Sequence, residues 1–308
     1  MENKKSEGII LSLIASFCGA CVPIFSKLIL EYLTPSFALF SRMVTSIILI
    51  TIVIFTIKKT KLVFTKQTIM IALFGSLNFV FFMLAIKFIP AHISPIFYSL
   101  VPVEATIFLF AIFREKISLL KIVGIVVGYL GAVVVILPSL GKHSDQKIEL
   151  IGVIFILLAS SSVAMYSVLV QKIGHQFSPY NLSFQSILLS LIFSIPLVLF
   201  SNGIQTEKNF NSIVFIYLVG IALIGTIGQY VVFQKSIALI HSSANVIFFY
   251  FQPLFVLIMS IAFLNESVKP TYFLGLIFVI IGSSLNLFTK AKKKQDHNVS
   301  INEDISSL

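Results

Sequence analysis

The fold of this chain is decided by a stretch of sequence that occurs twice, 151 residues apart. Residues 100–132 read LVPVEATIFLFAIFREKISLLKIVGIVVGYLGA, and residues 251–283 read FQPLFVLIMSIAFLNESVKPTYFLGLIFVIIGS. One proline, one glutamate and two glycines keep their places in both copies, as Pro102 and Pro253, Glu115 and Glu266, Gly124 and Gly275, and Gly131 and Gly282. The chain is therefore predicted to contain two structural repeats.

The sequence around these stretches is strongly apolar. Hydrophobic residues make up 57% of the 308 residues and charged residues only 11%, whereas a soluble globular domain carries about 25% charged residues. The apolar segments are continuous and lack the alternation of polar and apolar residues that marks a membrane β-strand. The composition therefore predicts a polytopic membrane protein built from helices, which satisfy their backbone polar groups within each span.

Ten apolar segments are long enough to cross a bilayer, which takes about 20 helical residues. We expect transmembrane helices at residues 9–26, 36–57, 69–86, 93–113, 119–137, 151–171, 182–200, 213–234, 243–264 and 271–289. Five helices fall in each repeat, and a second repeat that follows an odd number of crossings enters the membrane upside down, as in many transporters. The predicted fold is an all-α integral membrane protein with ten transmembrane helices in two inverted five-helix repeats.

The repeats divide the chain into four parts. Residues 1–139 form the first repeat, residues 140–150 a linker, residues 151–290 the second repeat, and residues 291–308 a basic and polar tail. The segments between the spans are short, so we expect any function to reside in the helices themselves.

The distribution of lysine and arginine predicts the orientation. Fifteen of these residues lie on the same side as the N-terminus: Lys4, Lys5, Lys58, Lys59, Lys61, Lys66, Arg114, Lys116, Lys121, Lys172, Lys235, Lys290, Lys292, Lys293 and Lys294. Six lie on the other side: Lys27, Lys87, Lys142, Lys147, Lys208 and Lys269. Cytoplasmic loops carry the excess of positive residues, so both termini are expected in the cytoplasm of a bacterial cytoplasmic membrane protein. The net charge of +10 then reflects orientation and not nucleic-acid binding.

Two charged residues stand out within the spans, where a central charge costs roughly 2.5–3.5 kcal/mol. Glu104, near the middle of the fourth span, favours recognition of a cationic or amine-bearing substrate, or a proton site; the alternative is a protonated or paired glutamate that packs helices. Arg42, in the second span, lies within reach of Glu104, and the pair would act as a gate or a clamp for a substrate carboxylate. The alternative is an arginine that extends to the lipid headgroups.

Uncharged polar residues recur at matching places in the two repeats. Asn78 and Gln229 are equivalent, and Asn245 and Gln252 fall on one face of the ninth span. One central cavity lined by both repeats would collect such groups, although hydrogen bonds between helices are the alternative explanation. The candidate substrate-binding residues are Glu104, Asn78, Tyr98, Gln229, Asn245, Gln252 and Arg42, joined by Tyr166 and Gln185.

The recurring prolines, glycines and glutamates have simpler interpretations. Pro102 and Pro253 each remove a backbone hydrogen bond in mid-span, and their equivalence favours hinges about which helices move. The glycine face from Gly124 to Gly131 predicts close helix packing. Glu115 and Glu266 end the fourth and ninth spans, and we expect each to cap or tether structure at its membrane surface.

Other classes of protein find little support. The phosphate-binding pattern G-x-x-x-x-G-K-[ST] of ATP-driven proteins does not occur. The five histidines are scattered, and Cys18 and Cys21 lie together in an apolar span, where small apolar side chains are the better interpretation. We therefore expect no catalytic residues, no metal and no cofactor.

An ordered set of motifs, present twice, resembles the drug/metabolite transporter superfamily, specifically the ten-helix permeases with two EamA domains. The first copy has AIKFIPAHIS at 85–94, LVPVE at 100–104, FREKIS at 113–118 and glycines from 124 to 131. The second copy has SIALIHSSAN at 236–245, FQP at 251–253, LNES at 264–267 and glycines from 275 to 282. The likeness covers residues 8 to 290. One departure is the lack of any tryptophan, with Phe17 near the place where the family often has an aromatic residue.

This resemblance implies a permease whose cargo comes from a broad range that includes amino acids, nucleoside derivatives, sugars and toxic cations. We expect a secondary transporter that moves a small polar metabolite, such as an amino acid or a related compound, by alternating access, with export as the first candidate direction. A lipid or isoprenoid-sugar flippase of the same fold is the alternative. The expected partners are the substrate, the lipid bilayer and a proton as candidate coupling ion, in a monomer or a homodimer.

Overall fold

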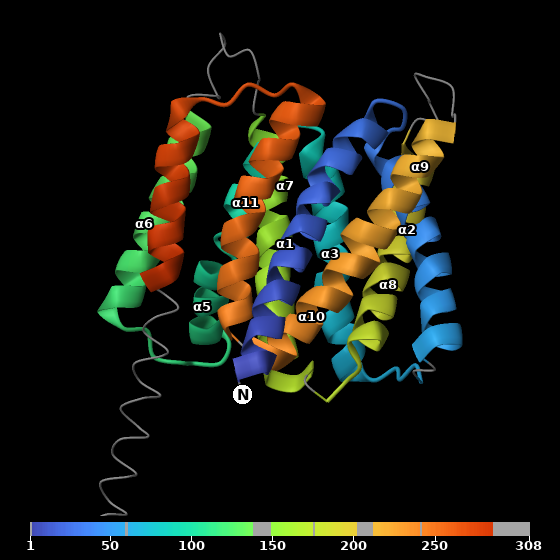
Figure 1. Cartoon of the computed structure of the whole chain (residues 1–308), viewed down its shortest axis with the longest axis horizontal. Helices are drawn as coiled ribbons and strands as arrows, with labels where there is room; N and C mark the ends of the chain where they lie inside the picture. Colours follow the sequence, from blue (N-terminus) through green and yellow to red (C-terminus); the bar gives the residue numbers. More distant parts are fainter. Residues whose placement is uncertain are drawn as a thin grey trace, which may run out of the picture.

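A computed structural model of the chain describes residues 2–58, 61–137, 149–174, 176–201, 212–240 and 242–285. Helices joined by short turns make up all of this described part (Figure 1). Eight helical segments within it are long and apolar enough to cross a membrane, and two shorter apolar helices follow them at Phe249–Leu264 and Pro270–Leu285. Most of the predicted linker and the whole predicted tail lie outside the described residues.

The first half of the chain forms five crossings. They are α1 (Glu2–Leu30), α2 (Pro35–Ile52) with the π-helix η1 (Val53–Lys58), α3 (Lys66–Ile86), the interrupted segment η2 (Ala91–Ile93), α4 (Ser94–Tyr98) and α5 (Val101–Ala111), and α6 (Leu119–Ile136). The helices of the first repeat overlap the five spans predicted there. The first begins earlier than expected because its N-terminal turns pack on the eighth crossing, where the Ser236 hydroxyl donates to the Gly8 carbonyl over 2.8 Å.

The second half repeats this order. Its elements are α7 (Leu150–Leu169) with η4 (Val170–Gly174), α8 (Pro179–Phe200), the composite crossing of α9 (Ser212–Gly220), η5 (Ile221–Gly228) and α10 (Gln229–Ile240), α11 (Ser242–Leu264) and the final helix Pro270–Leu285. In Figure 1, α1 rises from the N-terminus at the lower edge, whereas α7 starts at the upper edge and descends. The all-α fold with two inverted repeats is thus confirmed.

The two halves pack on each other through equivalent helices. The helix α1 packs against α10 and α11 of the second half, and its repeat equivalent α7 packs against α3 and α5 of the first half. Each first helix is therefore embedded in the opposite half. Polar side chains that point inward from either half consequently meet between them.

Glycines join α6 to the final helix at one side of the bundle, the left side in Figure 1. A Cβ atom on Gly131 would lie 2.6 Å from the Gly275 carbonyl oxygen, and a Cβ on Gly282 would lie 2.5 Å from the Gly124 carbonyl oxygen. The glycine face predicted to pack closely is therefore occupied by its counterpart in the other repeat. The opposite faces of these helices expose apolar side chains such as Val126 and Ile277, as lipid contact requires.

Candidate substrate site

The guanidinium of Arg42 is held inside the protein. The residue lies on α2 and is only 1% exposed. Its Nε and Nη2 atoms donate to the Thr226 hydroxyl of η5 over 3.2 and 3.1 Å, and the guanidinium carbon lies 5.3 Å from the centre of the Phe79 ring. Its third nitrogen, Nη1, is buried and has no hydrogen-bond partner among the described residues. Arg42 therefore does not extend to the headgroups, and it keeps one donor unused.

The carboxylate of Glu104 is also buried, at 2% exposure. Its Oε1 atom accepts hydrogen bonds from Ser160 and Ser161 of α7 over 2.9 and 3.3 Å, and from the Tyr129 hydroxyl of α6 over 3.5 Å. Its Oε2 atom is buried without a partner among the described residues. Sequence reasoning missed these three hydroxyl donors, although the run Ser160–Ser162 in an apolar span was a signal for two of them.

Arg42 and Glu104 do not form a direct ion pair. In the described part of the chain, Lys172 forms an ion pair with Glu115, and the His92 ring contacts Glu266. Tyr98, the last residue of α4, instead lies within electrostatic range of both Arg42 and Glu104. Tyr98 therefore belongs to the surroundings of both groups.

Asn78 fixes Tyr98 in this position. Its side-chain amide donates to the Tyr98 hydroxyl over 2.6 Å and to the Ala159 carbonyl of α7 over 3.2 Å. Asn78 therefore links α3 to α4 of the first half and to α7 of the second half. The structure thus brings four predicted residues, Arg42, Asn78, Tyr98 and Glu104, into one group.

Aromatic rings extend this group toward the second half. Tyr230 of α10 lies within electrostatic range of Arg42 and packs on Phe79, with ring centres 5.4 Å apart. The predicted residue Tyr166 meets Tyr230 edge to face, with ring centres 6.2 Å apart. Tyr166 therefore joins the site through Tyr230, which sequence reasoning did not select.

Gln229 and Gln252 come together against α1. A Cβ atom on Gly19 would lie 3.1 Å from the Gln252 amide nitrogen and 3.2 Å from the Gln229 amide nitrogen. The Gln252 carbonyl oxygen is buried without a partner among the residues that the structure describes. These two predicted residues of the second half thus both lie against one glycine of the first half.

One predicted residue lies elsewhere, and the side chain of another is not described. Gln185 donates to the Val63 carbonyl over 2.7 Å and to the Asn181 side chain over 3.1 Å. It therefore holds the connection between α2 and α3 and does not join Arg42 or Glu104. The side chain of Asn245 lies outside the described residues.

The two prolines differ in their positions within the helices. Pro102 is the second residue of α5, just after the break at Ser99 and Leu100, whereas Pro253 lies inside α11. Because Pro253 has no N–H, the carbonyl of Phe249 loses its usual helical donor. The Ser99 hydroxyl donates to this carbonyl over 2.8 Å, so the break in the fourth crossing is attached to the proline site of the ninth.

Substitution of Ser99 with alanine is expected to lower the free energy of unfolding by about 1 kcal/mol, because the hydrogen bond from the Ser99 hydroxyl to the Phe249 carbonyl is lost. Thermal unfolding in detergent measures this change. Ser94→Ala is the matched control, since that hydroxyl donates only to the nearby Ala91 carbonyl. Equal losses in the two variants would contradict a special role for the contact between Ser99 and Phe249.

Comparisons with known proteins agree with this architecture. The sequence profile of the EamA-like transporter family matches residues 6–137 and again residues 150–288. An uncharacterized transporter of Clostridium kluyveri is 26% identical over 261 residues, which cover 82% of this chain and 83% of the relative. The uncharacterized transporter YetK of Bacillus subtilis is 23% identical over 95% of this chain and 89% of its own length.

A solved crystal structure shares the fold. It has a TM-score of 0.60 and 12% sequence identity, and the match covers 93% of this chain and 98% of the other. Identity at this level supports the fold alone. The family profile, in contrast, matches both halves of the sequence and names a transporter. The chain is an integral membrane protein that belongs to the EamA-like transporter family.

Proposed function

We propose that this protein is a secondary transporter that carries a small zwitterionic metabolite, such as an amino acid or a related compound, across the bacterial cytoplasmic membrane by alternating access. The lower end in Figure 1, where the N-terminus lies, faces the cytoplasm in this proposal. The observation that carries it is that two buried side chains near Tyr98 each keep one polar atom without a hydrogen-bond partner among the described residues, Nη1 in Arg42 and Oε2 in Glu104.

Physical chemistry favours a zwitterion in this place. A buried charged group without a partner costs the full desolvation penalty, and an arginine nitrogen is best satisfied by a carboxylate oxygen. The free oxygen of Glu104 is correspondingly satisfied by an ammonium group. A substrate with both charges would satisfy both residues at once, whereas a ligand with one charge would leave the other residue unpaired.

The inverted repeats support movement by alternating access. In such folds the substrate site lies at the interface between the repeats, and discontinuous helices contribute to it. Here Tyr98 and Glu104 flank the break in the fourth crossing. Arg42 meets Thr226 of the second half, and Glu104 meets Ser160 of that same half. The site is therefore divided between the parts that would move.

Purified protein in liposomes tests this proposal with a matched panel of labelled compounds. The panel contains amino acids, amines that lack the carboxylate, carboxylic acids that lack the amine, and uncharged sugars. We expect transport of at least one zwitterion and much slower transport of its two singly charged analogues. Transport of sugars alone, or movement of a lipid probe without any zwitterion transport, would overturn the proposal, and the lipid result would favour a flippase.

Glu104 is also the group proposed to couple transport to protons, because its free oxygen binds either a proton or a substrate ammonium. Glu104→Gln is expected to abolish accumulation driven by a pH gradient, since an amide cannot exchange a proton. Uptake is measured with and without the gradient. Ser161→Ala is the control, because it removes a single hydrogen bond to the same carboxylate. Uphill transport by Glu104→Gln at the parent level would rule out this coupling.

A further inference from the structure

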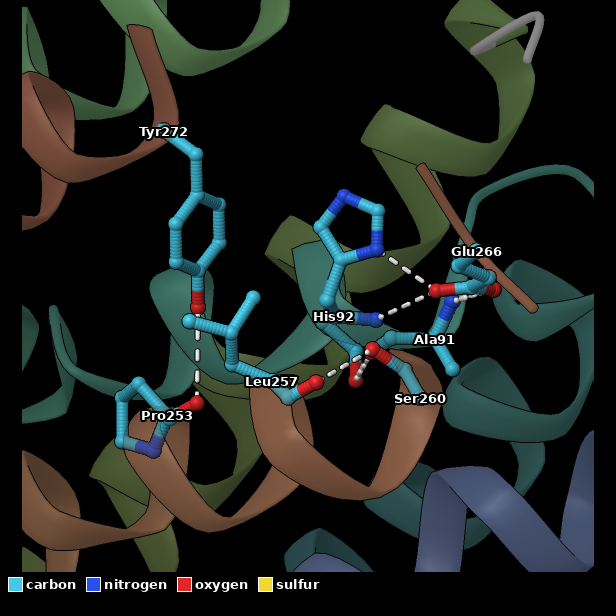
Figure 2. A network of polar contacts seen from close by, with 8 residues as sticks. Ala91, His92, Pro253, Leu257, Ser260, Glu266 and Tyr272 are labelled. Atoms are coloured by element: carbon cyan, nitrogen blue, oxygen red, sulfur yellow. Dashed lines mark hydrogen bonds and ion pairs between the residues drawn. The ribbon is translucent and has the colours of Figure 1, made fainter. Parts of the chain in front are cut away.

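Glu266 joins the end of the ninth crossing to the start of the fourth. The residue follows α11, and its carboxylate accepts hydrogen bonds from the backbone N–H groups of Ala91 and His92 over 2.7 and 3.2 Å. The same carboxylate contacts the His92 ring at Nδ1. Figure 2 shows it facing both backbone nitrogens and the ring. The tether expected of Glu266 therefore reaches from the second half of the chain to the first.

Helix chemistry explains why a carboxylate lies here. The first N–H groups of a helix have no acceptor within it, and a negative charge is favourable beside them. Burial raises the pKa of the Glu266 carboxyl, but hydrogen bonds from the His92 ring and from the Ala91 and His92 amides lower it more, so that the pKa lies below its ordinary value. The carboxylate is therefore ionised at neutral pH, which strengthens the hydrogen bonds that it accepts.

The His92 ring extends this contact to the proline of α11. Tyr272, in the final helix, packs edge to face on His92, with ring centres 5.4 Å apart. The Tyr272 hydroxyl donates to the Pro253 carbonyl over 3.5 Å, as Figure 2 shows. His92 is therefore held by residues of the second half, although it belongs to the first half in sequence.

The other end of the same segment is also fixed to the second half. The segment consists of η2 and α4, residues 91–98, and ends just before the break at Ser99 and Leu100. The Ser99 hydroxyl donates to the Phe249 carbonyl of α11 over 2.8 Å, and the Ser99 carbonyl accepts from the Ser283 hydroxyl of the final helix over 2.6 Å. The η2–α4 segment is therefore attached at both of its ends to helices of the second half.

Tyr98 is the last residue of the η2–α4 segment and meets the substrate site. Its hydroxyl accepts a hydrogen bond from Asn78 of α3 over 2.6 Å, and it lies within electrostatic range of Arg42 and Glu104. Tyr98 follows Ala91 by roughly 10 Å along the helix, at 1.5 Å per residue. Hydrogen bonds along a short helix keep it stiff, so a shift of its first turn moves its last residue as well. A displacement at Ala91 would therefore move the Tyr98 ring relative to Asn78.

We propose that Glu266 is a positioning residue for the substrate site, which acts through the η2–α4 segment and fixes the Tyr98 ring beside Asn78. The break at Ser99 and Leu100 separates this segment from α5, so the place of Tyr98 follows Glu266 and not the helix that carries Glu104. This inference rests on the proposed function, because it concerns the site that the function requires, but it does not depend on the identity of the cargo.

The surroundings of Tyr98 test the proposal without any substrate. A fluorinated tyrosine at position 98 gives a fluorine NMR signal that depends on what the ring contacts. Glu266→Gln is expected to shift this signal or to add a second one, since an amide cannot offer two acceptor oxygens to Ala91 and His92. Glu149→Gln neutralises an exposed carboxylate just before α7 and should leave the signal unchanged. An unchanged signal in Glu266→Gln would overturn the proposal.

A milder variant separates positioning from a long-range effect of the lost charge. His92→Phe keeps the Glu266 carboxylate and both backbone N–H groups, and it removes only the contact with the ring nitrogen. It should change the Tyr98 signal in the same direction as Glu266→Gln, by a smaller amount, and it carries the test if Glu266→Gln does not fold. A Tyr98 signal that stays unchanged in His92→Phe would speak against positioning through the η2–α4 segment.

Transport in liposomes shows whether the effect reaches the substrate through Tyr98. Glu266→Gln is expected to raise the KM of a transported zwitterion by about tenfold, because part of the free energy of the charge-assisted hydrogen bonds is lost from the site. In a Tyr98→Phe background the same substitution should raise the KM by less than about twofold, since the effects of coupled residues do not add. Equal factors in the two backgrounds would contradict action through Tyr98.

The two readouts separate this inference from the proposed function. If the fluorine signal changes as expected but no zwitterion in the panel is transported, the proposed cargo is wrong and the positioning of Tyr98 by Glu266 stands. If zwitterions are transported but neither Glu266→Gln nor His92→Phe alters the Tyr98 signal, the proposed function stands and the positioning role is wrong.

Discussion

Replacement of Gly282 with leucine is expected to remove most of the folded protein. A side chain at this position would meet the backbone nitrogen of Gly128 and the carbonyl oxygen of Gly124. Backbone atoms of a helix cannot turn aside as a flexible side chain can, so α6 and the final helix would have to separate. Overpacking a tight site typically costs 1–3 kcal/mol, and we expect a loss of about 3 kcal/mol or more here.

The membrane makes this substitution more damaging. Lipid tails are as apolar as the side chains, so helices associate there through close packing and hydrogen bonds, without a hydrophobic driving force between them. The yield of monodisperse protein after detergent extraction and its melting temperature measure the effect. Ile281→Leu, on the exposed face of the same helix, should behave like the parent. A parent-like yield for Gly282→Leu would show that the two helices are not packed through their glycines.

The sequence predicted the helices and their repeat well because these depend on local composition. A continuous apolar segment of about 20 residues has few alternatives to a membrane helix. A proline in mid-span removes a hydrogen bond wherever the helix lies, and the fourth crossing is indeed interrupted just before Pro102. The glycine face required only a regular spacing to be recognised as a packing surface.

The partners of the buried charges could not be predicted in the same way. Which residue meets Glu104 depends on the rotation of α7 about its own axis, which packing sets and local sequence does not. Thr226 meets Arg42 from a π-helix, whose wider turn shifts side chains away from the positions that regular α-helical spacing predicts. Gln185 was selected as a polar residue within a span, but its side-chain amide donates a hydrogen bond to the backbone carbonyl of Val63.

The repeats also assign different roles to equivalent residues. Asn78 donates to Tyr98 and Ala159, whereas its equivalent Gln229 lies against Gly19. Tyr98 itself corresponds to Phe249, which has no hydroxyl. Symmetry in the sequence therefore predicts a shared architecture but not a symmetric site. This asymmetry is what a substrate with two different ends requires.

Arg42→Met is expected to slow transport of a zwitterion by about 100-fold or more while the melting temperature stays the same or rises. A hydrogen bond to a charged group contributes about 1.5–3 kcal/mol, and a factor of ten in binding corresponds to 1.4 kcal/mol. Replacing a buried ionic group with an apolar one of similar volume is often neutral or stabilising. Thr226 also keeps a hydrogen bond in the variant, because its hydroxyl donates to the Ile221 carbonyl over 3.1 Å.

Initial rates of exchange in liposomes and thermal unfolding in detergent measure the two effects separately. Lys235→Met, which removes an exposed positive charge from α10, should leave both unchanged. A lower melting temperature with a normal transport rate per folded molecule would make Arg42 a structural residue.

An analogue without the carboxylate sharpens this test. The parent protein should transport such an analogue slowly, and Arg42→Met should transport it no more slowly, since the contact that the variant removes is already missing. If Arg42→Met instead slows the analogue as much as the zwitterion, the arginine acts on something other than the substrate carboxylate. The comparison therefore tests one contact, the one between Arg42 and the substrate carboxylate. A general disturbance of the helices around Arg42 would slow the zwitterion and the analogue alike.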